Sequence, residues 1–320
     1  MVRWVDPTLQ TKVTYRAGDT MICVPPKSGT TWTMNIFHQL KTKGDPDFED
    51  IYAEVPWVEF REGPDQSDEE LLERWAKMAS PRGFKTHSFP NTQPGGMMEY
   101  REDLKYVVVV RNPEEALVSF KPFLASHNPK LYDHWRVPEL REALTSFPDF
   151  PAFFENFLLK GLPGMPAEAV PPGGLVTMFF IGFVNAWWPL RRAKNVLMIH
   201  FNDMKADHEG SVRRIGDFLG CSLTEQEWAR VFEYTSFDWM KRHQSKFEVR
   251  TLLPFPLLRE GGMVRKGESG RTGEDGMTPE ISARVRGLVD AMVEDEAARE
   301  WLYEGGRIPK EKRNNKCAIQ

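Results

Sequence analysis

The chain has 320 residues, of which 41% are hydrophobic and 28% charged, and its formal net charge is −4 at pH 7. This length can bury a sizeable core in one large domain or two small ones. The slightly negative charge gives no indication of nucleic-acid binding. The three scattered cysteines (Cys23, Cys221 and Cys317) make neither a disulfide framework nor a zinc site, which favours a reducing, cytoplasmic location. No apolar run approaches signal-peptide or membrane-spanning length, so we expect no transmembrane segment.

Short apolar runs predict the strands of a parallel sheet. They lie at 20–24, 83–86, 105–110 and 195–201, and helical patterns lie between them. Strands that alternate with helices are typical of an α/β fold. We therefore expect residues 1–320 to form a single domain with a central parallel sheet flanked by helices.

The remaining segments of the chain give helix and loop signals. Asn112 and Pro113 are suited to the cap and first position of a helix that follows the third strand. The stretch 121–175 is proline-rich, aromatic and weakly periodic, which indicates a long excursion over one rim, where substrate loops are common. A C-terminal helix is expected at 279–303, followed by a flexible tail at 304–320.

The segment VPPKSGTTW, residues 24–32, has the chemistry of a phosphate-binding loop. It lies between an expected strand and an expected helix, so that backbone N–H groups and the positive end of the helix dipole point at one spot. Gly29 allows close approach of a ligand, and Lys27 adds charge. The hydroxyl groups come from Ser28, Thr30 and Thr31. Helix capping alone would also explain serine and threonine here, which leaves a capped helix with a solvated lysine as an alternative.

Five segments taken in chain order resemble the cytosolic sulfotransferases. They are PKSGTTW at 26–32, FKTHSFP at 84–90, YVVVVRNPEEALVSF at 106–120, TSFDWMK at 235–241 and VRKGESG at 264–270. The order and approximate spacing are those of the family, and the likeness extends over about residues 14–275. The chain is therefore similar to a divergent member of this family.

The resemblance implies both the donor and the reaction. The donor would be 3′-phosphoadenosine 5′-phosphosulfate (PAPS), the nucleotide product 3′,5′-adenosine bisphosphate, and the acceptor a small molecule with a hydroxyl or amine. Residues 24–32 would then form a P-loop-like phosphosulfate-binding loop. Sulfuryl transfer, like phosphoryl transfer, depends on positioning and electrostatics. Because lysines can supply the positive charge, no metal is expected.

The resemblance also implies the catalytic residues. His87 would be the general base, since an alcohol that attacks sulfur must lose its proton and an imidazole suits that task near neutral pH. Lys27 and Lys85 would neutralise the charge that develops on the transferred group. Without the neighbouring motifs, a structural histidine and solvated lysines would be adequate interpretations.

A larger set of residues would bind the donor. The resemblance assigns Lys27, Ser28, Gly29, Thr30, Thr31, Trp32, Arg111, Ser119, Thr235, Ser236, Phe237, Met240, Arg265, Lys266 and Gly267 to this role. Arg111 and Ser119 would hold the 3′-phosphate, because a guanidinium fork and a hydroxyl two helical turns further on can converge on one group. Trp32 and Phe237 would stack on adenine. Trp32 also begins an apolar helical stripe, so a core position is the alternative.

The acceptor is not specified by these motifs. Segments 55–63, 120–136 and 147–183 are expected to build its pocket, and their phenylalanine and tryptophan content favours a largely apolar molecule. Two other functions remain open: a nucleotide kinase or triphosphatase that uses 24–32 as its phosphate loop, and a non-catalytic nucleotide-binding protein. A homodimer is possible, but no recognisable motif supports one. The final Cys317-Ala-Ile-Gln has the form of a prenylation signal.

Overall fold

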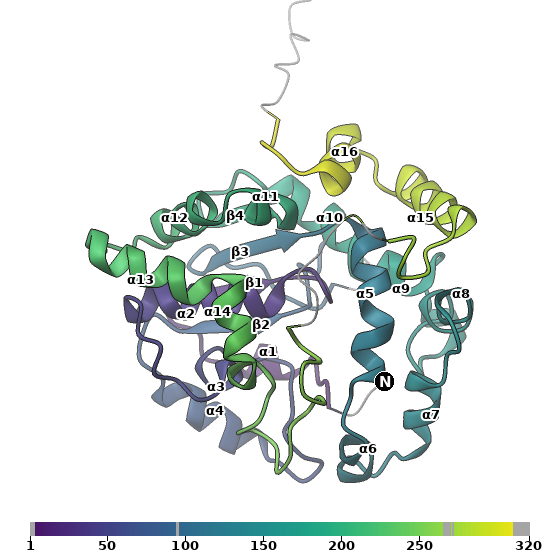
Figure 1. The fold of residues 1–320 in the computed structure, drawn as a ribbon, viewed down its shortest axis with the longest axis horizontal. Coiled ribbons are helices and arrows are strands. Elements are labelled where there is room, and N and C mark those ends of the chain that lie inside the picture. The colour runs from purple at the N-terminus through teal and green to yellow at the C-terminus, as the bar shows by residue number, and fades with distance from the viewer. Residues whose placement is uncertain (1–3, 94–95, 265–269, 271, 310–320) are drawn as a thin grey trace, which may run out of the picture.

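A four-stranded parallel sheet lies at the centre of the protein (Figure 1). The computed structural model describes residues 4–93, 96–264, 270 and 272–309. The strands are β1 (Thr20–Cys23), β2 (Gly83–Thr86), β3 (Lys105–Val110) and β4 (Val196–His200), in the order β2-β1-β3-β4. Nearly all their residues are buried, as expected for continuous apolar runs in a parallel sheet. The predicted strands and the α/β fold are confirmed.

Helices surround this sheet. They are α1 (Leu9–Lys12), α2 (Thr30–Thr42), α3 (Ile51–Glu54), α4 (Asp68–Lys77), α5 (Pro113–Ala125), α6 (Lys130–His134), α7 (Glu139–Thr145), α8 (Phe150–Phe153), α9 (Gly174–Val176), α10 (Gly182–Trp187), α11 (Phe201–Ala206), α12 (His208–Leu219), α13 (Glu225–Thr235), α14 (Phe237–Arg242), α15 (Pro279–Met292) and α16 (Glu296–Glu304). Helix α2 packs against β1 and β2, while Trp187 of α10 packs against Tyr106 of β3 with ring centroids 5.2 Å apart.

The two central strands carry the two segments that are predicted to bind anions to one edge of the sheet. Strands β1 and β3 are neighbours, with Cys23 opposite Val108. Each strand continues through a short loop into a helix, α2 after β1 and α5 after β3. The Asn112 side chain caps α5 by accepting a hydrogen bond from the backbone N–H of Glu114, as its sequence predicted. Parallel strands thus direct both loops toward the same rim.

A buried ion pair joins the N-terminal ends of β1 and β2, at the edge of the sheet opposite the two loops. The Nε of Arg82 donates to Oδ2 of Asp19 at 3.1 Å, and both side chains are almost fully buried. Arg82 also donates to the backbone carbonyls of Thr14 and Trp75, so its remaining donors are satisfied. A charge pair that is buried and fully hydrogen-bonded fixes the geometry of the chain around it. This pair therefore sets where the two strands begin.

The stretch 121–175 differs in detail from its sequence-based description. After α5 the chain forms the short helices α6, α7 and α8 and a π-helical turn, Phe154–Leu158, rather than an irregular loop. A second π-helical turn, Thr177–Ile181, follows α9. Figure 1 shows this part of the chain standing beside α5, away from α12 and α13. Short helices separated by proline and glycine leave little room for a regular apolar period, which explains the weak sequence signal.

The C-terminal helix predicted at 279–303 is two helices, so that prediction is wrong in one respect. Helix α15 ends at Met292, and α16 begins after Asp295, whose side chain accepts a hydrogen bond from the backbone N–H of Ala298. Arg299 donates to the carbonyl of Val293 and so satisfies the end of α15. This N-cap and C-cap pair breaks the helix although the apolar period continues.

One helical stretch, Ala167–Leu190, is long and apolar enough to cross a membrane by length and composition alone. The expectation that no apolar run reaches that length is therefore wrong. In its most apolar window, 44% of the residues are buried inside the protein, among them Phe180 and Val184. Core helices of soluble proteins meet the same criterion, so the stretch is weak evidence for a membrane span.

Candidate active site

The loop between β1 and α2 has a left-handed backbone at two positions. Lys27 has φ +62° and Gly29 has φ +98°. A Cβ atom on Gly29 would lie 2.7 Å from Cδ2 of Phe201, so both the backbone and the available space require glycine. A lysine held in this conformation is strained, and such strain is concentrated at functional sites.

The first turn of α2 offers hydrogen-bond donors to an anion. The first N–H groups of any helix have no partner within it, and they lie at the positive end of its dipole. The hydroxyl of Thr30 is buried and has no hydrogen-bond partner among the described residues. Thr31 lines the adjacent cavity, whereas Ser28 is fully buried, with its hydroxyl 3.4 Å from the carbonyl of Pro26. The orphaned Thr30 hydroxyl is therefore a hydrogen-bond donor that a ligand could satisfy.

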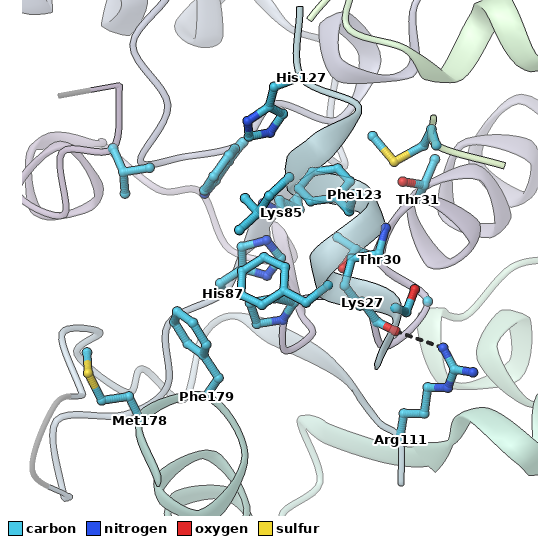
Figure 2. Close-up of a pocket in the computed structure, with 18 of the residues that line it drawn as sticks. Lys27, Thr30, Thr31, Lys85, His87, Arg111, Phe123, His127, Met178 and Phe179 are labelled. Atoms are coloured by element: carbon cyan, nitrogen blue, oxygen red, sulfur yellow. Dashed lines mark hydrogen bonds between the residues drawn. The ribbon is translucent and has the colours of Figure 1, made fainter. Parts of the chain in front are cut away.

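Arg111 joins this loop to the start of α5 (Figure 2). Its Nη1 donates to the backbone carbonyl of Lys27 at 3.1 Å, and its Nε and Nη2 donate to Oε2 of Glu115 at 3.0 and 2.9 Å. The guanidinium also lies over the ring of Phe201, 4.6 Å from its centroid. Ser119, one turn beyond Glu115, lines the same cavity. The loops after β1 and β3 therefore meet at this cavity.

His87 follows β2 and has a defined tautomer. Its Nδ1 lies 2.6 Å from the backbone carbonyl of Val24. Because a carbonyl oxygen only accepts, Nδ1 carries the proton and Nε2 keeps a basic lone pair. Burial, reinforced by the charges of Lys85 and Lys27, holds the pKa of His87 well below its usual range. The side chain is thus a neutral imidazole near neutral pH.

Lys85 lies almost fully buried beside His87. Its Nζ is 3.2 Å from the ring centroid of Trp57, and the same ring meets His87 edge-on at 5.2 Å. Burial lowers the pKa of Lys85 well below its usual value, and the carboxylate of Glu59 opposes that shift. Glu59 is itself buried, and the hydroxyl of Thr86 donates to it. Burial raises the pKa of Glu59.

These groups open into one cavity of about 690 Å³. Lys27, Thr30, Thr31 and Arg111 line it together with His87 and Lys85 (Figure 2). Much of the remaining wall is aromatic: Trp4, Phe60, Phe89, Phe120, Phe157 and Phe179. Each segment expected to build an acceptor pocket contributes to this wall. The volume and apolar lining are those of a small-molecule site.

The residues expected around adenine divide into two groups. Trp32, Phe237 and Met240 line the cavity, and Phe237 is 42% exposed. Thr235 and Ser236 are not among its lining residues, because their hydroxyls serve the ends of helices α13 and α14. The hydroxyl of Thr235 donates to the carbonyl of residue 231, and that of Ser236 accepts from the N–H of residue 239. The carbonyl of Thr235 accepts a hydrogen bond from the indole N–H of Trp32 at 2.8 Å.

The remaining predicted donor-binding residues, Arg265, Lys266 and Gly267, lie outside the described residues, as does Cys317. The chain nevertheless returns to the site at Gly270, whose N–H donates to Oε1 of Glu115 at 3.0 Å. This contact brings the segment after α14 next to the Arg111–Glu115 pair.

Several residues of the site were missed in the sequence. Glu115 lies four positions after Arg111, a spacing that favours an ion pair on a helix and could have been noticed. The ring of Phe123 lies 4.1 Å from Nζ of Lys27, and His127 lines the cavity beyond it. Nothing in the local sequence distinguishes these two from other residues of an aromatic helix. Within the described ranges, no group of three or more His, Cys, Asp or Glu side chains is placed to hold a metal ion.

An anion-binding loop beside a basic imidazole in an apolar cavity suits an enzyme that transfers a charged group to a small molecule. The sequence matches the model of the sulfotransferase domain over residues 17–297. The chain belongs to this family, and the resemblance seen in the five motifs is confirmed.

Known proteins give the same result. Sulfotransferase 2A6 of Rattus norvegicus is 27% identical over 258 residues, which cover 78% of each chain. The 3-alpha-hydroxysteroid sulfotransferase of Cavia porcellus is 29% identical over 257 residues, covering 79% of this chain and 76% of its own. Among solved structures, the mouse sulfotransferase SULT7A1 complexed with PAP has a TM-score of 0.61 at 20% identity, covering 92% of this chain and 90% of its own. This structural likeness establishes the shared fold.

Proposed function

We propose that the protein transfers the sulfuryl group of PAPS to the hydroxyl of a small, largely apolar acceptor, with His87 as the general base. One observation carries this proposal. The hydrogen bond between Nδ1 of His87 and the carbonyl of Val24 leaves Nε2 basic, in a cavity that contains both an anion-binding loop and an apolar wall. Family membership supports the reaction class.

The donor end of the cavity fits an anionic nucleotide. The N-terminus of α2 and the orphaned hydroxyl of Thr30 would hold the 5′-phosphosulfate, with Lys27 as the neighbouring cation. Arg111 and Ser119 would hold the 3′-phosphate. Trp32 and Phe237 of the cavity wall would lie on either side of adenine. The mouse relative of the same fold is complexed with PAP, which supports this use of the site.

The chemistry of the chain's own residues depends on their charges. PAPS supplies the activated sulfuryl group when bound. Nε2 of His87 accepts the proton of the acceptor hydroxyl as the O–H bond breaks, and the Nδ1–H bond to Val24 stabilises the resulting imidazolium. Lys27 offsets negative charge at the transferred group. Lys85 would offset the same charge in its protonated form, because a bound anion would oppose the effect of burial on the pKa of Lys85.

The cavity wall favours an apolar acceptor. A cavity of about 690 Å³ with mainly aromatic lining excludes water and rewards burial of hydrocarbon. One relative is named as a 3-alpha-hydroxysteroid sulfotransferase, which supports a rigid apolar alcohol as the first class to test. The carboxyl of Glu59 also lies in the cavity wall and would suit an amine. An amine acceptor is therefore a variant of this proposal.

The other functions that the sequence left open have less support. Lys27 precedes Gly29, the reverse of the triphosphatase loop, and β3 leads into Arg111 rather than an aspartate that could hold Mg²⁺. We infer that residues 1–320 act as one domain, as the alternation of strands and helices predicts, and that the protein acts in the cytoplasm, as its cysteine content predicts. The proposed reaction depends neither on the number of domains nor on the oligomeric state.

The test is direct. The protein is incubated with PAPS labelled in its sulfuryl group and with apolar alcohols, phenols and amines, and labelled products are separated. We expect transfer to alcohols and tight calorimetric binding of 3′,5′-adenosine bisphosphate, with weak binding of ATP. Binding of the bisphosphate without transfer to any acceptor would favour the non-catalytic alternative. Preference for ATP would favour the kinase alternative.

A further inference from the structure

We propose that His127 is a second polar contact for the acceptor, which selects apolar alcohols that carry another hydroxyl away from the one that is sulfated. The inference rests on the proposed function, because it concerns the acceptor half of the same cavity. It adds a specificity-determining residue and narrows the substrate class from apolar alcohols to apolar diols.

His127 is held rigidly in the cavity wall. It follows the end of α5, lines the cavity and is 7% exposed. Its backbone forms an antiparallel bridge with Leu258, and the N–H of Asn128 donates to the carbonyl of Leu257 at 2.9 Å. The N–H of Arg259 donates to the carbonyl of residue 126 at 2.8 Å. Residues 126–128 and 257–259 are thus hydrogen-bonded to each other, which fixes the backbone from which the imidazole projects.

One ring nitrogen of His127 is left for a ligand. Its Nδ1 lies 3.2 Å from the hydroxyl of Tyr132, and Nε2 has no hydrogen-bond partner among the described residues. Burial lowers the pKa of His127 to about 4, so the imidazole is neutral under physiological conditions. A hydrocarbon placed against this nitrogen would leave it without a hydrogen bond, which costs free energy, whereas a ligand oxygen would pair with it.

The position of His127 separates it from the reacting groups. The ring of Phe123 contacts both His127 and Lys27: its centroid is 4.1 Å from Nζ of Lys27 and 5.2 Å from the His127 ring. Ala125, the last residue of α5, is about 9 Å along the helix from Ser119 at 1.5 Å per residue, and His127 follows two residues later. Figure 2 likewise shows His127 and Arg111 at opposite sides of the cavity. We infer that His127 faces the part of an acceptor that lies on the side of the cavity away from Arg111.

A hydroxyl is the group that suits this nitrogen best. The Tyr132 hydroxyl either donates to Nδ1 or accepts from it, which makes Nε2 a donor in one case and an acceptor in the other. A ligand hydroxyl both donates and accepts, so it pairs with Nε2 in either tautomer. A methyl group at the same place would leave the nitrogen unpaired.

The experiment compares 1-alkanols with α,ω-alkanediols of matched and increasing chain length. Dissociation constants are measured from intrinsic tryptophan fluorescence with 3′,5′-adenosine bisphosphate bound, since Trp4 and Trp57 line the cavity. At the best chain length we expect the diol-to-alkanol affinity ratio to fall about 10-fold in His127→Phe, which removes the nitrogens at similar volume. His127→Gln should recover part of the ratio. In turnover the same change should appear in KM, with little change in kcat.

The control is Leu124→Met, which alters an apolar wall residue and should leave the ratio unchanged. An unchanged ratio in His127→Phe at every chain length would overturn the inference. Because the fluorescence measurement needs no turnover, failure to transfer sulfuryl groups would overturn the proposed function instead. A ratio change of the same size in Leu124→Met would also overturn the role of His127, since it would reflect shape rather than hydrogen bonding.

Discussion

The Nη1 atom of Arg111 donates a hydrogen bond to the backbone carbonyl of Lys27 at 3.1 Å, so the loops that follow β1 and β3 are directly joined. Arg111 follows β3 and Lys27 follows β1, and these strands are neighbours in the sheet. The left-handed backbone of Lys27, φ +62°, turns that carbonyl toward the guanidinium. In the proposed donor site, this hydrogen bond would link the positions of the 3′-phosphate and the 5′ group, so Arg111 would both bind and position the nucleotide.

The first prediction concerns Arg111→Ala. We expect affinity for 3′,5′-adenosine bisphosphate to fall about 10- to 100-fold, since a charge-assisted hydrogen bond contributes roughly 1.5–3 kcal/mol. Affinity for adenosine 5′-phosphate, which lacks the 3′-phosphate, should fall much less. Calorimetric titration measures both. Arg111→Lys is the matched control, because it keeps the charge without the planar fork. Equal losses for the two nucleotides would remove Arg111 from the 3′-phosphate.

The second prediction concerns the buried pair at the far end of the sheet. Asp19→Ala leaves Arg82 buried without its partner and should lower the free energy of unfolding by about 3–5 kcal/mol. Urea unfolding measures this change. Asp103→Ala is the control, since its ion pair with Arg101 is exposed and should contribute little to stability. Equal effects of the two substitutions would mean that burial does not decide the strength of the pair. Nucleotide affinity of the folded Asp19→Ala protein should be unchanged.

Local sequence pattern was enough to predict the strands and the loop between β1 and α2. Strands buried on both faces appear as apolar runs, and the glycine of 24–32 reflects the left-handed backbone of a tight turn. The break between α15 and α16 was missed because one capping residue, Asp295, is a weaker sequence signal than the apolar periodicity on both sides of it. The roles of Thr235 and His127 depend on which segments cross, a tertiary property that no local spacing contains. The same holds for Ala167–Leu190, whose apolar character reflects core packing.

The third prediction concerns the charge of Lys85. Burial holds its folded pKa well below the usual value. A bound anion raises that pKa, so the sign of the effect is proton uptake on donor binding. Calorimetric titration of 3′,5′-adenosine bisphosphate in buffers of different ionisation enthalpy measures the uptake. We expect less uptake in Lys85→Met, which keeps the shape of the side chain. Identical uptake in the native and Lys85→Met proteins would assign the proton to another group.

The last prediction concerns His87. His87→Ala should bind 3′,5′-adenosine bisphosphate nearly as well as the native protein, while transfer to an aliphatic alcohol falls about 10²–10⁴-fold, the usual contribution of a general base. Lys27→Ala should lose both affinity and turnover, because its charge acts on the donor in ground and transition states alike. Single-turnover rates together with calorimetry separate the two phenotypes. An acidic phenol is a poor test acceptor, since it needs little help to lose its proton.

The pH profile gives an independent check on the same residue. A general base acts when deprotonated, so kcat/KM falls as pH drops through its pKa in the free enzyme. Burial holds the pKa of His87 well below its ordinary value of 6.5, so the acid limb should lie below that pH and the profile should stay flat from there through neutrality. In His87→Ala this limb should disappear from the residual activity. Near-native rates with an aliphatic alcohol in His87→Ala, or an acid limb that survives the substitution, would place the base elsewhere in the cavity.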